Sequence, residues 1–169
     1  CDCCLVRVEE ATALAREHPE TLATLLGFEE LHRLVERQPH GVLSTTETFE
    51  RERPEVCARL VRGLVAASRV LHDRPEMFHR AVRDHVRHVT PTDEEIRSIW
   101  RQEHDSGSFA VNGGMSRAHW EANIALFRRL NPGPAPCDCL DALLADKFAR
   151  EALAELGPHP GTTFDPPVA

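Results

Sequence analysis

The fold is decided by residues 41–75, which read GVLSTTETFERERPEVCARLVRGLVAASRVLHDRP. The pattern predicts a short strand over 42–44, then a short helix, and then a long helix that begins at Pro54. Proline suits the first turn of a helix because its missing N–H would have no intrahelical partner there. Pro75 ends the long helix and opens the next one for the same reason. We expect the rest of the chain to be organised around this long helix.

Apolar residues recur along the long helix at spacings of four, four, three and four, which places them on one face. Val61 and Val65 widen this stripe, whereas Arg69 and Asp73 fall on the other side. Cys57 lies beside the stripe and is expected in the core. The stripe itself consists of Val56, Leu60, Leu64, Ala67 and Leu71.

The length and the charge of the chain exclude several classes of protein. The chain has 169 residues, of which 41% are hydrophobic, so it can bury one core and is expected to be a single domain. A net charge of −7 argues against a nucleic-acid partner or an anionic membrane surface, because both need clustered positive charge. No apolar stretch is long enough to span a bilayer. The chain opens on Cys-Asp-Cys-Cys without a signal peptide, and we expect a fragment or a processed product.

Two further strands are expected in the first part of the chain. An apolar run suits a buried strand over residues 4–8. Residues 31–35 fit either the end of a helix or another strand, and we interpret them as a strand. Residues 9–17 are typical of a helix between them. The expected total is two or three short strands with six or seven helices, which is a helix-rich α/β fold. The domain is expected to span residues 1–157, followed by a disordered tail over 158–169.

The second half of the chain predicts four helices with clear ends. Residues 78–89 form a strongly amphipathic helix. Thr92 and Glu95 form a capping box that opens the second helix, and Ser116 caps the third. The fourth is expected from about residue 140 to Leu156, where a Gly-Pro step stops it.

Phe49 precedes the Pro54-Glu55 step at the start of the long helix, and Arg74 precedes Pro75-Glu76 at its end. This pattern resembles the C-terminal half of the substrate-binding proteins of ABC importers, in the group that handles nitrate, taurine, aliphatic sulfonates and thiamine-pyrimidine precursors. The resemblance covers about residues 1–157. It implies a truncated periplasmic-binding-protein-like fold of type II, with the end of the second lobe, the crossover strand and the C-terminal helices.

The function implied by this resemblance is a solute-binding component of an ABC importer, not an enzyme. Its solute would be a small anionic or heteroaromatic molecule such as a sulfonate, nitrate or a pyrimidine. The implied partners are an ABC permease and either the missing N-terminal lobe or a second copy of the chain. The implied location is the periplasm or the cell surface, and no cofactor is expected.

In the resembled family the ligand lies between the lobes, near the ends of the strands that carry the crossover. Arg7 can pair an anionic sulfonate or carboxylate bidentately, and Ser44 or Thr45 can donate a hydrogen bond. The residues alone fit a solvated edge around Arg7 and a helix cap at Thr45 or Thr46 equally well. The candidate ligand-binding residues are Arg7, Glu9, Glu10, His40, Ser44, Thr45 and Thr46.

A second hypothesis is an enzyme on the same scaffold. The Arg51-Glu-Arg-Pro54 step is similar to one in the aromatic sulfinate desulfinases, whose catalytic cysteine lies in the first lobe. Such an enzyme would be cytoplasmic.

A third hypothesis is a thiolate metal-binding protein. Two Cys-x-Cys groups can offer soft ligands to zinc or copper(I). No His or Cys follows them at finger-like spacing, so packing as small apolar residues or disulfide formation is the simpler interpretation. These candidates are Cys1, Cys3, Cys137 and Cys139.

Histidine is frequent, with ten in the chain. His85 shares the apolar face of its predicted helix and is expected as a hydrogen-bonded core histidine, whereas the neighbouring His72, His79 and His88 fall on polar faces. No His-Glu-x-x-His motif occurs. Asn112-Gly113-Gly114 is interpreted as a turn.

Overall fold

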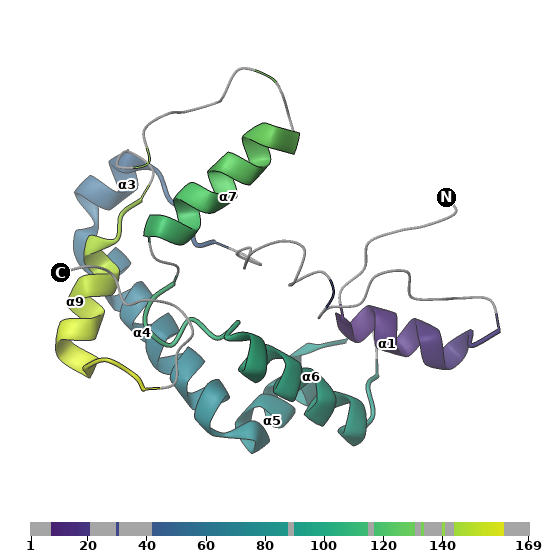
Figure 1. Cartoon of the computed structure of the whole chain (residues 1–169). Helices are drawn as coiled ribbons and strands as arrows, with labels where there is room; N and C mark the ends of the chain where they lie inside the picture. Colours follow the sequence, from purple (N-terminus) through teal and green to yellow (C-terminus); the bar gives the residue numbers. More distant parts are fainter. Residues whose placement is uncertain are drawn as a thin grey trace.

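The computed structural model describes residues 8–20, 30, 42–87, 90–114, 117–130, 133, 140 and 144–160. Within these residues the chain is helix-rich and contains no strand (Figure 1). The seven helices described are α1 (Val8–Glu17), α3 (Glu47–Glu52), α4 (Pro54–Asp73), α5 (Pro75–His85), α6 (Asp93–Ser106), α7 (Arg117–Leu130) and α9 (Lys147–Leu156).

The strand expected over residues 42–44 is wrong, whereas the helix-rich character is confirmed. Val42 and Leu43 are 62% and 59% exposed, and no strand of the described residues lies beside them to complete their hydrogen bonds. The segment leads instead into Thr46, whose backbone is extended as an N-cap requires and whose hydroxyl accepts a hydrogen bond from the N–H of Phe49 at 3.1 Å. Of the two other expected strands, 31–35 lies outside the described residues, and 4–8 does so except for Val8, which begins α1.

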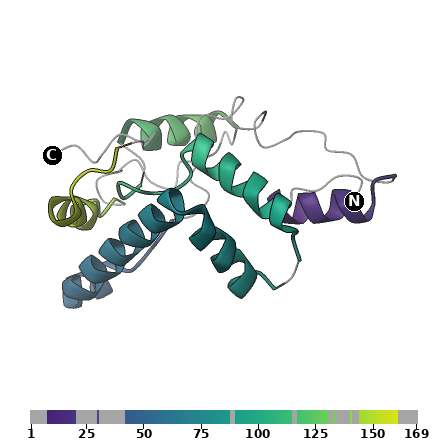
Figure 2. The same cartoon turned by 90° about the horizontal axis from the view of Figure 1, so that it is seen from below.

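Helix α4 is the central element, and it begins at Pro54 and ends before Pro75 as expected. Helices α3, α5 and α9 all pack against it, and Figures 1 and 2 show α9 (yellow) lying beside it. Small residues on α9, the buried Ala149 and Ala152, let the two helix backbones approach closely.

The buried side of α4 differs from the predicted one. Cys57 and Val65 are buried at 7% and 2% exposure, so the core placement of Cys57 is confirmed. Leu60 and Leu64, at the middle of the predicted stripe, remain 48% and 47% exposed. The reason is that α9 packs on the neighbouring side, where Arg69 can reach the end of that helix.

Helices α5 and α6 pack against each other beyond the end of α4. The capping box of Thr92 and Glu95 is confirmed, and α6 ends at Gly107, whose left-handed φ of 70° suits glycine. The first turns of α6 bury Ile96 at 1% exposure. The core placement of His85 is wrong, because α5 ends at this residue and leaves its side chain exposed.

Helix α9 is shorter than expected, because residues 144–146 are not helical and the helix begins at Lys147. Asp146 precedes the helix without a capping hydrogen bond from its side chain, and its carboxylate pairs instead with Arg150 one turn later. Lys147 pairs with Glu50 at 2.6 Å, which ties the start of α9 to α3. Gly157 stops α9, as predicted. None of the described helices combines the length and the apolar character needed to cross a bilayer.

The contact between α1 and α6 provides a prediction for acid stability. Glu95 accepts hydrogen bonds from the backbone N–H of Thr92 and from Arg16, and the Thr92 bond is the main cause that lowers its pKa below the ordinary 4.5. A lowered pKa in the folded state adds stability above the ordinary value, and this stability is lost as the pH falls through the folded value.

We therefore expect Glu95→Gln to unfold more easily than the wild type at pH 7, with the difference shrinking as the pH is lowered below about 4.5. Urea unfolding of both proteins over this pH range measures the effect. Glu94→Gln, at the exposed neighbouring position, is the control and should show no such pH-dependent difference. An equal loss of unfolding free energy at every pH would contradict this, because it would show that the charge of Glu95 does not contribute to stability.

Candidate functional site

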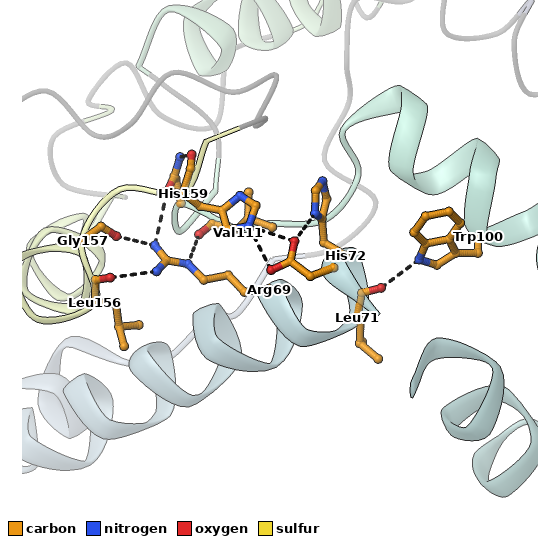
Figure 3. A network of polar contacts seen from close by, with 10 residues as sticks. Arg69, Leu71, His72, Trp100, Val111, Leu156, Gly157 and His159 are labelled. Atoms are coloured by element: carbon orange, nitrogen blue, oxygen red, sulfur yellow. Dashed lines mark hydrogen bonds and ion pairs between the residues drawn. The ribbon is translucent and has the colours of Figure 1, made fainter. Parts of the chain in front are cut away.

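A polar cluster joins the last turns of α4 to the turn after α6 and to the segment after α9 (Figure 3). Its anchor is Arg69. The guanidinium donates to the carbonyl oxygens of Val111 at 2.9 Å, Leu156 at 3.1 Å and Gly157 at 2.6 Å. Leu156 and Gly157 end α9, where helix carbonyls lack intrahelical partners and carry partial negative charge. One cation on α4 therefore satisfies acceptors from two other segments.

Asn112 fixes the segment after α9 in place. It is 2% exposed, its Oδ1 accepts from the backbone N–H of His159 at 2.8 Å, and its Nδ2 donates to the carbonyl of the same residue at 3.2 Å. Its Oδ1 also lies 3.4 Å from Arg69. The side-chain amide thus pairs with a peptide unit as a neighbouring strand would. We expected residues from 158 onward to be a disordered tail, but residues 158–160 are part of this structure.

The turn that carries Asn112 allows a close approach to α9. Val111 is 1% exposed, and Gly113 has a φ of +83°. A Cβ atom on Gly113 would lie 2.8 Å from the Cβ of Ala149. Glycine is therefore required here both by the backbone and by the neighbouring helix.

Asp73 lies between two histidines. His72 Nδ1 is 2.8 Å from Asp73 Oδ1, and His159 Nε2 is 3.0 Å from the same oxygen. An ionised carboxylate only accepts, so both ring nitrogens donate to it. The hydrogen bond from His72 is the largest cause that lowers the pKa of Asp73, burial opposes it, and the bond from His159 adds to the lowering. The two imidazoles are 11% and 12% exposed, whereas Asp73 is 51% exposed.

Aromatic rings continue the cluster towards α6. His72 stacks on His104 with ring centroids 4.4 Å apart, and His104 in turn lies 4.8 Å from the ring of Trp100. Trp100 also donates from Nε1 to the carbonyl of Leu71 at 2.8 Å, as Figure 3 shows. His159 meets the other side of this group, with its ring 5.0 Å from that of His72. The cluster therefore brings imidazoles from α4, α6 and the segment after α9 together.

The ligand-binding residues predicted from the sequence lie elsewhere. Arg7 and His40 are outside the described residues, Glu9 and Glu10 belong to α1, and Ser44 and Thr45 are exposed before α3. Thr46 caps α3, as the sequence allowed. Figures 1 and 2 place α1 and the α3–α4 end at opposite ends of the molecule, so the described members of this set are not brought together.

The metal hypothesis cannot be located in the structure, because its four cysteines lie outside the described residues: Cys1, Cys3, Cys137 and Cys139. Cys57 is a buried free thiol.

The sequence did not predict that Arg69 and His159 belong to a site, or that the ring of His72 is largely buried. The one local signal was Asn112 followed by two glycines, because a polar residue before a tight turn is well placed to bond a distant backbone.

Arg69 provides a prediction that separates a half-buried cation with several acceptors from an exposed one. Arg69→Met removes the donor of three carbonyl oxygens, and we expect the free energy of unfolding to fall by about 2–3 kcal/mol. Arg62 on the same helix pairs with Glu155 of α9 at 2.6 Å, but both side chains are exposed. Arg62→Met should therefore cost at most about 1 kcal/mol. Urea unfolding of the two variants measures the difference, and equal losses would show that the carbonyl contacts of Arg69 contribute no more than a surface ion pair.

The two glycines of the turn provide a second matched pair. Both have positive φ, so alanine strains the backbone by about 1–3 kcal/mol at either position. Only Gly113→Ala also places a Cβ against Ala149, because nothing lies within 4 Å of a Cβ at Gly114. We expect Gly113→Ala to be the more destabilising by about 1–3 kcal/mol in urea or thermal unfolding. Equal losses of stability in the two variants would contradict this, because they would show that α9 moves away from the new Cβ without a cost in free energy.

Comparisons of this chain with protein-family models, with curated proteins and with solved structures each gave no match. Its function is therefore argued from its own residues.

Proposed function

We propose that this chain is the C-terminal portion of a solute-binding component of an ABC importer. The observation that supports the proposal is the order of the helices. A short helix carrying Phe49 leads to the long α4 with Pro54 at its first position, and α5 follows with Pro75 at its first position. This is the succession that the sequence resemblance implies.

The proposed solute is a small anionic or heteroaromatic molecule such as a sulfonate, nitrate or a pyrimidine. Ser44 and Thr45 are exposed in the non-helical segment before α3, so their hydroxyl groups are accessible to a solute. Thr46 has a structural task, because its oxygen accepts the N–H of Phe49. In this proposal the two hydroxyl groups donate hydrogen bonds to the anion.

The proposed partners are an ABC permease and the first lobe of the binding protein or a second copy of the chain, with an exported location. Exposed apolar side chains on α3 and α4 support the expectation of a partner surface. Phe49 is 44% exposed and lies on the helix before Leu60 and Leu64. Burying such side chains stabilises an assembly in proportion to the apolar area removed from water.

Thermal unfolding in the presence of candidate solutes tests this function. A solute that binds only the native state raises the melting temperature, and at a concentration 100 times its Kd it adds about 2.7 kcal/mol. We expect a shift with at least one sulfonate, nitrate or pyrimidine at saturating concentration. Replacing Ser44 and Thr45 together by alanine should reduce the shift, whereas Thr90→Ala, at another exposed threonine, should not.

Two results would contradict the proposal. If the melting temperature did not change with any of these solutes, the proposed binding function of this chain would be contradicted. A chain that released sulfite from an aromatic sulfinate would be an enzyme, which is the second hypothesis raised by the sequence.

A further inference from the structure

We propose that His72, Asp73 and His159 form a binding site for a divalent transition-metal ion, with zinc as the ion that fits best. This inference is independent of the proposed transport function. Two imidazole nitrogens and one carboxylate oxygen lie within 4.8 Å of one another. They come from the last two residues of α4 and from the segment after α9. This donor set of two histidines and one carboxylate is one that catalytic zinc sites use.

Two of the three distances between ligand atoms are already close to those of a zinc site. With zinc–ligand bonds of about 2.0–2.2 Å, the ligand atoms of a tetrahedral site are roughly 3.3 Å apart. Asp73 Oδ1 is 2.8 Å from His72 Nδ1 and 3.0 Å from His159 Nε2. Each of these two distances therefore increases by only a few tenths of an ångström, and the two imidazole nitrogens, which lie within 4.8 Å of each other, adjust to the same spacing. The ion takes the place of the two protons that the imidazoles now donate to the carboxylate. Each imidazole binds the ion as a neutral ligand, so a protonated ring releases one proton to solvent, whereas a neutral ring carries its proton on the other nitrogen.

The surroundings leave room for a fourth ligand. Asp73 is 51% exposed, so a water molecule can reach the ion from the side of its carboxylate. The two imidazoles are almost buried, and their orientation is fixed by neighbours. His72 stacks on His104, and the backbone of His159 is held by Asn112. A rigid and largely preformed site limits the entropy lost when the ion binds.

The guanidinium of Arg69 is engaged by other groups. Arg69 is one turn before Asp73 on α4, but its guanidinium is directed at the carbonyl oxygens of Val111, Leu156 and Gly157. These acceptors offset its charge. His159 Nδ1 is buried without a hydrogen-bond partner in the described structure. It is unpaired when Nε2 donates to Asp73 and also when Nε2 binds the ion, so metal binding does not create a new unpaired group.

Binding would fasten the end of the described chain to its central helix. Asp73 and His159 are 86 positions apart, so the ion closes a long loop between α4 and the segment after α9. Because this arrangement exists only in the folded chain, the ion stabilises the native state by mass action. Three protein ligands hold the ion and a fourth position is left to water, as in catalytic zinc sites.

The experiment compares thermal unfolding of the full chain with zinc chloride, with magnesium chloride and with EDTA. Accessible cysteines are first alkylated on the folded chain, which spares the buried Cys57, because thiolates elsewhere in the chain could also bind zinc. We expect zinc to raise the melting temperature by several degrees and magnesium to leave it unchanged, since magnesium prefers oxygen ligands. Calorimetric titration should give one zinc ion per chain.

Three variants locate the site. Asp73→Asn keeps a hydrogen-bonding group of the same shape but removes the anionic ligand, and His72→Gln and His159→Gln each remove one imidazole. We expect each to lose most of the zinc-dependent shift, with circular dichroism showing that the helices remain. The control is His79→Gln, which breaks the exposed pair between His79 Nε2 and Asp93 at 2.8 Å and should keep the full shift.

A cobalt spectrum identifies the ligands if a variant fails to fold. Tetrahedral Co²⁺ bound by nitrogen and oxygen gives visible bands without the near-ultraviolet charge-transfer band of a thiolate. No zinc-dependent shift in the alkylated wild type would overturn the proposal. A shift that survives in Asp73→Asn, or a thiolate band with cobalt, would also overturn it.

Discussion

The described structure depends on one guanidinium group that reaches across from the central helix. In the described residues no sheet joins distant parts of the chain, so the helices are held by side chains. Arg69 supplies donors to the last carbonyls of α9 and to the turn after α6 at the same time. A helix end and a turn both have free carbonyl oxygens, and a planar cation with several donors is well suited to satisfy them. The position of α9 on α4 follows from this contact.

The polar cluster is a consequence of the same arrangement. Once α9 ends beside Arg69, the chain after Gly157 must run along α4, and Asn112 is within reach of its backbone. His159 then meets Asp73, which His72 already contacts. The same contacts to backbone groups that hold the segment after α9 therefore also bring the histidines together. The arrangement of His72, Asp73 and His159 therefore depends on the contacts that Arg69 and Asn112 make with backbone groups.

Local signals in the sequence predicted the helices well, and long-range contacts were missed. Pro54, Pro75 and the pair of Thr92 and Glu95 mark helix starts because each acts on backbone groups within one turn. The ends of α6 and α9 at glycine are equally local. The extended segment at Val42 was mistaken for a strand, since an apolar run does not show whether a partner strand exists.

The candidate site was beyond local analysis. The pairing of Asp73 with His159 joins residues 86 positions apart, and no periodicity reports it. The predicted stripe on α4 was displaced for a related reason, because the choice of buried face depended on α9.

Trp100 makes this long-range packing visible to spectroscopy. Its indole ring lies against His104 and bonds to the backbone of α4, so its fluorescence will respond when α6 separates from α4. The chain thereby contains an intrinsic optical probe within a few ångströms of the histidine cluster.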